Sequence, residues 1–198
     1  MKSNVCKIDN GIKDLEAILA ESEKIAADNN LSEKQTLQLR LLCEEVDGML
    51  PKIIGEFDGD FWIEFEGGIC KLNALIEFKE FTIEKKEELI SVATNKKNAS
   101  VKGLVDKIWV AIMDFFLEEG TYDTSEMPAT THYIPTEDWG GVVYYRLWGL
   151  EQYKSTIKQE DEEAWDELEK SIIASIADDV IVGVRGKKAS IVIVKKFA

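Results

Sequence analysis

Hydrophobic residues recur at intervals of three and four along residues 33–57. This spacing predicts one long amphipathic helix, because it places the apolar side chains on a single helix face. Ser32 and Gln35 form a capping-box pattern, so we expect the helix to begin at Glu33. Gly48 and Pro51 weaken its second half. The apolar stripe consists of Leu39, Leu42, Val46, Leu50, Ile53 and Phe57.

Residues 60–78 instead alternate apolar and polar side chains, a period of two that is typical of strands. A tight turn at Gly67-Gly68 divides the segment, so we expect a β-hairpin with one buried face. The first strand alternates Phe61, Ile63 and Phe65 with Trp62, Glu64 and Glu66, and the second carries Cys70, Leu72, Ala74, Ile76 and Phe78 on its buried face.

The same reasoning predicts the other elements. Residues 12–27 form a helix that Asn29-Asn30 ends, and residues 84–92 and 101–116 form two further helices. Residues 161–179 form one helix whose first turns are acidic, and residues 180–194 form a second hairpin. Residues 1–10 are either an edge strand or a disordered start, and 142–148 either a strand or an apolar helical turn. In the acidic helix we expect Trp165, Leu168, Ile172 and Ile176 to face inward.

Two adjacent acids, Glu44 and Glu45, lie in the middle of the long helix. At 100° per residue, Glu45 lies at the edge of the apolar stripe beside Met49, while Glu44 lies nearly opposite. An acid at the edge of a buried face can line a cleft, which makes Glu45 a candidate catalytic residue. The alternative is a solvated acid on the helix flank, paired with Lys52.

A helix with two acids followed by two antiparallel strands resembles the core of the histidine-kinase-like ATPase superfamily (the Bergerat fold). Among its branches, the anti-sigma-factor serine kinases are the most similar in layout. The order helix, helix, hairpin, lid, helix, hairpin extends the resemblance to residues 12–118 and 160–197. The resemblance implies an α+β two-layer sandwich with a mixed, largely antiparallel sheet and helices on one face. Residues 1–198 would form a single domain, with an insertion at about 120–159.

The resemblance also implies ATP and magnesium as cofactors, with Glu45 as general base and Glu44 as the fallback. Met49 stands four residues after Glu45, where the family has an asparagine that holds magnesium. The family's D-x-G-x-G box, which reads adenine, should follow the second strand, but residues 77–82 contain neither aspartate nor glycine. We therefore expect affinity for Mg-ATP to be weak or absent, and activity as a serine-protein kinase or ATPase stays open.

The segment that resembles the family's lid combines lysines with amides and hydroxyls at a helix start. Such a place can bind phosphate through backbone N–H groups and the helix dipole. The alternative is a capped helix with solvated lysines. The candidate residues are Lys96, Lys97, Asn98, Ser100, Lys102 and Gly103.

Composition excludes several classes of function. A net charge of −14 argues against nucleic acid as a partner and against binding to anionic membranes by charge. The three scattered cysteines suit buried thiols in a reducing compartment. No apolar run is long enough to span a bilayer, and the N-terminus lacks a signal-peptide core, so we expect a cytoplasmic protein. The single histidine, His132, has no neighbouring cysteine or histidine with which to form a zinc site.

The function that the resemblance implies is that of a bacterial regulatory protein, similar to an anti-sigma factor, with weakened or lost kinase chemistry. By resemblance its partner would be a sigma factor or an anti-anti-sigma-type regulator. The alternative is a non-catalytic protein–protein interaction module that kept the fold and lost the nucleotide. The aromatic-rich segment 120–159 would then be a partner surface or a flap over the core. The oligomeric state stays open.

Overall fold

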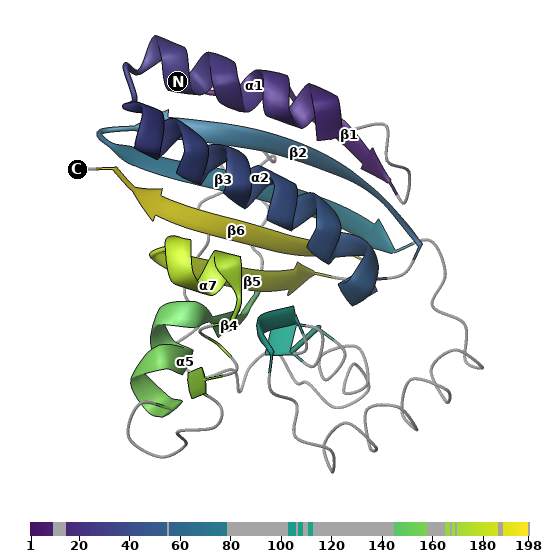
Figure 1. Ribbon diagram of the computed structural model, residues 1–198. Coiled ribbons are helices and arrows are strands. Elements are labelled where there is room, and N and C mark those ends of the chain that lie inside the picture. Colours follow the sequence, from purple (N-terminus) through teal and green to yellow (C-terminus); the bar gives the residue numbers. More distant parts are fainter. Residues whose placement is uncertain are drawn as a thin grey trace.

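The computed structural model describes residues 1–9, 15–54, 56–78, 103–105, 107–108, 111–112, 145–157, 165–166, 168, 170–185 and 188–197. Within these ranges the chain is an α+β structure with one open antiparallel sheet (Figure 1). The six strands are β1 (Cys6–Asp9), β2 (Phe57–Glu66), β3 (Ile69–Phe78), β4 (Tyr145–Gly149), β5 (Asp179–Arg185) and β6 (Lys188–Lys196). The labelled helices are α1 (Leu15–Asp28), α2 (Glu33–Ile54), α5 (Leu150–Ile157) and α7 (Ile172–Ile176).

The two predicted hairpins lie side by side in this sheet, whose strand order is β1-β2-β3-β6-β5-β4. The turn between β2 and β3 is made by Gly67 and Gly68, whose φ angles of 57° and 80° suit glycine. β3 then pairs with β6, with Ala74 opposite Ile191. Both predicted hairpins therefore belong to one sheet, and β1 is the edge strand beside β2.

Two local signals separate α1 from α2. Asn30 has a φ of 53°, and the Leu31 N–H donates to the carbonyl of Ala26, as in a Schellman helix end. The Ser32 N–H donates to Gln35 Oε1 at 2.9 Å, and the Gln35 N–H donates back to Ser32 Oγ at 3.4 Å. This reciprocal pair is the predicted capping box, and α2 begins at the predicted residue.

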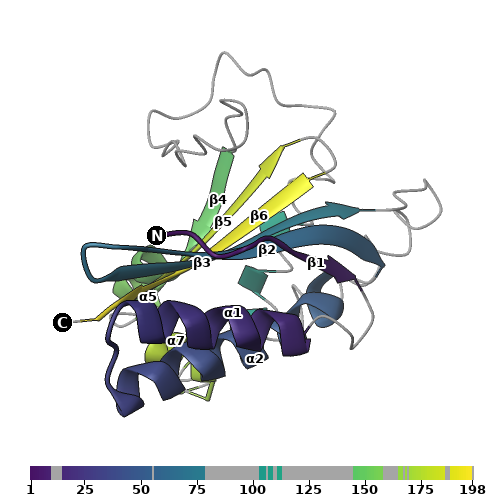
Figure 2. The same ribbon diagram turned by 90° about the horizontal axis from the view of Figure 1, so that it is seen from above.

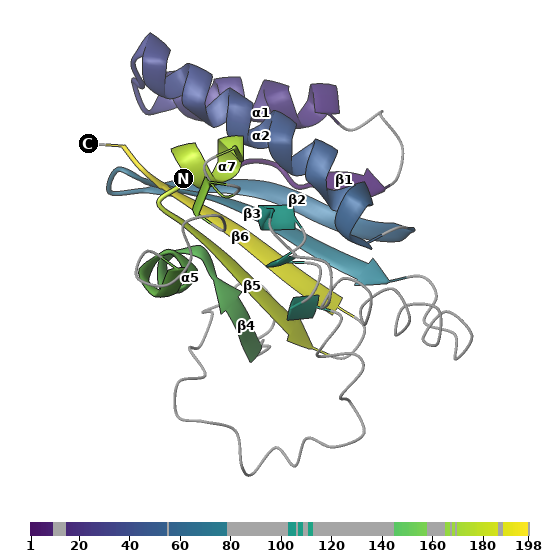
Figure 3. The same cartoon turned by 60° about the horizontal axis from the view of Figure 1, so that its bottom comes forward.

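The helical layer covers one face of the sheet. Figure 3 shows α1, α2 and α7 over the same face, and Figure 2 shows α1 and α2 running side by side. Burying this face stabilises the fold by removing apolar surface from water. From α2 the core receives Leu39, Leu42, Cys43, Val46, Met49 and Leu50, all at most 3% exposed; β3 contributes Cys70, Leu72, Ala74, Ile76 and Phe78, all at most 5% exposed.

Phe57 does not belong to the helix. Its assignment to the apolar stripe of the helix is wrong, because α2 ends at Ile54 and Phe57 is the first residue of β2, opposite Phe78. The side chain is still 1% exposed. Phe57 thus enters the same core from the sheet, and one buried residue at the end of a stripe does not distinguish helix from strand.

The region before β5 also differs from the predicted single helix. Ser171 caps a separate short helix, α7, and its hydroxyl accepts a hydrogen bond from the Ala174 N–H at 3.3 Å. This new start resets the helical phase, so that Ile173 is 2% exposed whereas Ile172 is 40% exposed. The inward position predicted for Ile172 is therefore wrong, while that of Leu168, at 1% exposure, is confirmed.

The strand alternative for the region around residue 145 is correct. β4 pairs with β5 and forms the sixth strand, so this part of the predicted insertion extends the sheet. α5 follows directly, and its Leu150 and Ile157 belong to the common core. The helix at 84–92, the aromatic residues between 121 and 144, His132 and the turn at 186–187 lie outside the described residues.

Asp178 connects α7 to the end of β6. Its carboxylate accepts a hydrogen bond from the Lys196 N–H at 2.6 Å and lies 3.2 Å from Lys195 Nζ. Burial raises the pKa of this carboxyl, but the hydrogen bonds from Lys196 and Lys195 outweigh burial, so the pKa is lowered from 3.8. A carboxyl with a lowered folded-state pKa stabilises the fold above its unfolded value and loses that contribution as the pH falls through the folded pKa.

We therefore expect Asp178→Asn, which keeps an acceptor but removes the charge, to lower the free energy of unfolding at pH 7. The loss should be at most about 1 kcal/mol, because the Asp178 side chain is 37% exposed and solvent screens the pair. Urea unfolding should show the difference from the parent protein shrinking toward zero at about pH 2. The exposed Asp166→Asn is the control, and an equal loss at both pH values would contradict the assignment.

Candidate functional site on helix α2

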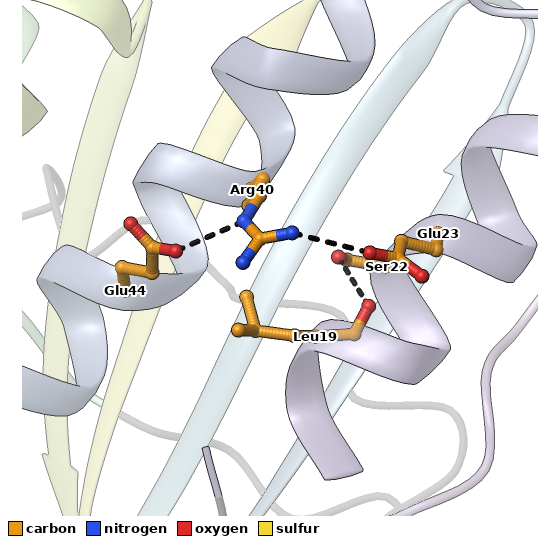
Figure 4. Close-up of polar contacts among 5 residues, drawn as sticks. All are labelled: Leu19, Ser22, Glu23, Arg40 and Glu44. Carbon is orange, nitrogen blue, oxygen red and sulfur yellow. Dashed lines mark hydrogen bonds and ion pairs between the residues drawn. The ribbon is translucent and has the colours of Figure 1, made fainter. Parts of the chain in front are cut away.

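Glu44 is held in an ion-pair bridge between the two long helices. Arg40 Nε donates to Glu44 Oε1 at 3.0 Å, and Arg40 Nη1 donates to Glu23 Oε1 at 3.2 Å (Figure 4). Arg40 lies one helical turn before Glu44 in α2, and Glu23 belongs to α1. The bridge therefore gives Glu44 a structural contact on the exposed side of α2.

Glu45 lies at the edge of the buried face of α2, where the helical spacing predicts it. Its side chain is partly buried, and its neighbours one turn away, Leu42 and Met49, are 0% and 3% exposed. Glu44 is partly buried as well, so burial alone does not distinguish the two acids. A cleft lined by Glu45 therefore stays a prediction.

Met49 stands where the family resemblance expects a magnesium ligand. It is 3% exposed and belongs to the common hydrophobic core. Its thioether sulfur is a weak, soft acceptor, whereas magnesium selects oxygen ligands. The Met49 side chain therefore packs in the core and offers no oxygen ligand to a magnesium ion.

Of the six candidate residues in the lid segment, the structure describes only the last. Gly103 stands just before a helical segment, and its carbonyl accepts a hydrogen bond from the Lys107 N–H at 3.0 Å. The helix predicted for 101–116 is confirmed at the described positions, where Leu104, Ile108 and Ile112 are at most 1% exposed and join the core. Lys96, Lys97, Asn98, Ser100 and Lys102 lie outside the described residues.

The three cysteines are buried free thiols, as predicted. Burial raises the pKa of the Cys70 thiol to about 12 and raises that of Cys43 further, with nearby Cys70 adding to the effect. Because the thiolate is the reactive and metal-binding form, these thiols are poor nucleophiles and ligands at neutral pH. Within the described ranges, no three histidine, cysteine, aspartate or glutamate side chains group together to hold a metal ion.

The sequence pattern does not identify one charged residue, Lys154, as a candidate site residue. Lys154 on α5 is partly buried, and its Nζ donates to the carbonyl of Ala174 in α7 at 2.6 Å. The sequence of α5, LEQYKSTI, contains no motif that distinguishes this lysine from a solvated one. Its position follows only from the way α5 packs beside α7.

Comparisons with protein-family models, with curated proteins and with solved structures found no significant match. In the part of the chain that the structure describes, no helix combines the length and the hydrophobicity needed to cross a bilayer. The candidate site therefore rests on the residues and geometry given above.

Proposed function

We propose that the chain is a regulatory protein with the histidine-kinase-like ATPase fold, related to anti-sigma-factor kinases, whose kinase chemistry is weakened or lost. One observation carries this proposal. α1 and α2 precede the β2–β3 hairpin, a later hairpin completes the same antiparallel sheet, and α2 packs its apolar face into the core. By the same resemblance, the partner would be a sigma factor or an anti-anti-sigma-type regulator.

The details of α2 support weakened chemistry. Glu45 is the candidate general base, because it borders the buried face, whereas Glu44 is engaged by Arg40. Met49 packs in the core at the place of the magnesium ligand. A binding site that lacks its buried polar partner loses much of its affinity, since the ligand's polar edge is left unpaired.

The second candidate function is a non-catalytic interaction module with the same fold. It is favoured by the ion pair of Glu44 with Arg40 and by the burial of Met49, because both positions then serve structure alone. The two candidates differ in one measurable property, which is whether any nucleotide binds.

We expect Mg-ATP at 1 mM to shift the melting temperature little or not at all, and calorimetry to give a Kd no tighter than the high micromolar range. A ligand at 100 times its Kd would add about 2.7 kcal/mol to the free energy of unfolding, which a thermal-shift assay detects easily. No binding at all favours the interaction module. Sub-micromolar binding would contradict the proposed loss of chemistry.

If weak binding is found, the triple variant Lys96→Ala, Lys97→Ala, Lys102→Ala should abolish it while the melting temperature stays nearly unchanged. The reason is that lysine ammonium groups contact phosphates as point charges. Lys24 and Lys34, both exposed on α1 and α2, provide the control substitutions. Unchanged binding in the triple variant would show that the basic segment is a solvated surface.

A further inference from the structure

A pocket separate from the α2 acids lies between α5, the helical residues 165, 166 and 168, and α7. Its volume is about 390 Å³, and its lining includes Lys154, Trp165, Leu168, Ala174 and Ser175. This volume is within the range of small-molecule sites, which are mostly apolar with a few placed polar groups. Among the described lining residues, one cation and one hydroxyl stand beside three apolar side chains.

Lys154 is the charged group of the pocket, and its position is fixed. Its Nζ donates to the Ala174 carbonyl at 2.6 Å, which uses one of the three N–H donors of an ammonium. Burial lowers the pKa of Lys154, and the nearby Asp178 and Asp179 offset part of that effect. The lysine is therefore partly stripped of water, which strengthens its attraction for an anion.

The two neighbouring aspartates already have partners of their own. Asp178 contacts the Lys196 N–H and the Lys195 ammonium. Asp179 Oδ1 accepts hydrogen bonds from the backbone N–H groups of Glu151 and Val180, both at 2.9 Å. Both carboxylates thus hold strand and helix ends together, and neither belongs to the described residues that line the pocket.

The apolar part of the pocket comes from Trp165 and Leu168. Leu168 is 1% exposed, and Trp165 is partly buried and packs against the common core. Ser175 is exposed, and its hydroxyl donates to the Ser171 carbonyl at 2.9 Å. A ligand that lies against the indole ring of Trp165 would bury apolar surface while one polar end reaches Lys154.

We propose that this pocket binds a small organic carboxylate with an aromatic or branched apolar body. The carboxylate accepts hydrogen bonds from Lys154 Nζ, and the apolar body lies against Trp165. A single ammonium matches one carboxylate charge, whereas the described lining contains no arginine fork for a phosphate group. This site is independent of the proposed function on α2.

The test uses indole-3-acetate and its neutral counterpart indole-3-acetamide as probes, with isothermal calorimetry on the full chain. We expect indole-3-acetate to bind with a Kd below about 1 mM and the amide at least about tenfold more weakly, because it lacks the charge. Lys154→Met keeps most of the unbranched side chain but removes the ammonium group, and it should weaken acetate binding at least about tenfold. The matched control Lys34→Met, at an exposed lysine of α2, should bind as the parent protein does.

A second variant tests the pocket independently, in case Lys154→Met does not fold. Ser175→Phe places a large side chain at an exposed position of the pocket lining, so it should block binding while the melting temperature changes little. Absence of binding by the parent protein at 5 mM indole-3-acetate would overturn the proposal. Equal binding by Lys154→Met, or equal affinity for acetate and amide, would also overturn it.

Discussion

Leu42→Ala should lower the free energy of unfolding by about 2–5 kcal/mol, because it removes a fully buried side chain and leaves a cavity. Leu42 is 0% exposed and lies in the middle of α2, one helical turn before Val46 in the same apolar stripe. α2 packs over the sheet on this side, and the space has little freedom to collapse. Urea unfolding monitored by circular dichroism gives the difference.

Leu37→Ala is the matched control for this prediction. It is the same substitution in the same helix, but Leu37 is 55% exposed. Its effect should stay within about 0.5 kcal/mol, as for most surface substitutions. Similar losses for the two variants would mean that α2 does not pack by the predicted face.

The sequence predicts the N-terminal half well because its signals are local. The capping box at Ser32 and Gln35 and the turn at Gly67-Gly68 depend only on neighbouring residues, and both appear where expected. The core stripe from Leu39 to Leu50 follows from helical spacing alone. By contrast, the assignment of Phe57 fails because the residue reaches the same core from a strand.

The prediction fails at a local helix start that the apolar spacing does not reveal, and at a side chain covered by a distant segment. Ser171 starts a new helix, which moves the inward position from Ile172 to Ile173. By strand alternation Trp62 points away from the helical face of the sheet, yet its side chain is only 5% exposed. Lys2 Nζ lies 5.0 Å from the centroid of the Trp62 ring, and Trp62 Nε1 donates a hydrogen bond to Glu64. Strand alternation identifies the two faces of a sheet, but it does not predict how a large ring on the outer face is covered.

The candidate site is predicted only in part for the same reason. Helical spacing predicts different positions for Glu45 and Glu44, but the structure leaves both acids partly buried, so burial does not separate them. Helical spacing within α2 does not predict the contact with Glu23, because Glu23 reaches Arg40 from another helix. Lys154 likewise becomes distinctive only when α5 packs beside α7. The contacts of these charged side chains depend on how distant segments pack, and no short sequence motif predicts that packing.

Gly59 marks a close approach of three strands. It pairs with Ile8 in β1 and with Ile76 in β3. A Cβ at this position would lie 2.5 Å from the carbonyl oxygen of Leu75 and 3.0 Å from Ile8 Cγ1. The carbonyl belongs to the backbone of β3, so it moves only if the strands separate.

Gly59→Ala should therefore lower the free energy of unfolding by about 1–3 kcal/mol, the usual cost of overpacking. Gly48→Ala is the matched control with the opposite expected sign. Gly48 is inside α2, and a Cβ there would meet nothing within 4 Å, so alanine should raise stability by about 0.5–1 kcal/mol through its higher helix propensity. Chemical unfolding of the two variants beside the parent protein measures both changes. A gain at Gly59 would mean that β1, β2 and β3 do not meet in this register, and a loss at Gly48 would mean that α2 is interrupted before Pro51.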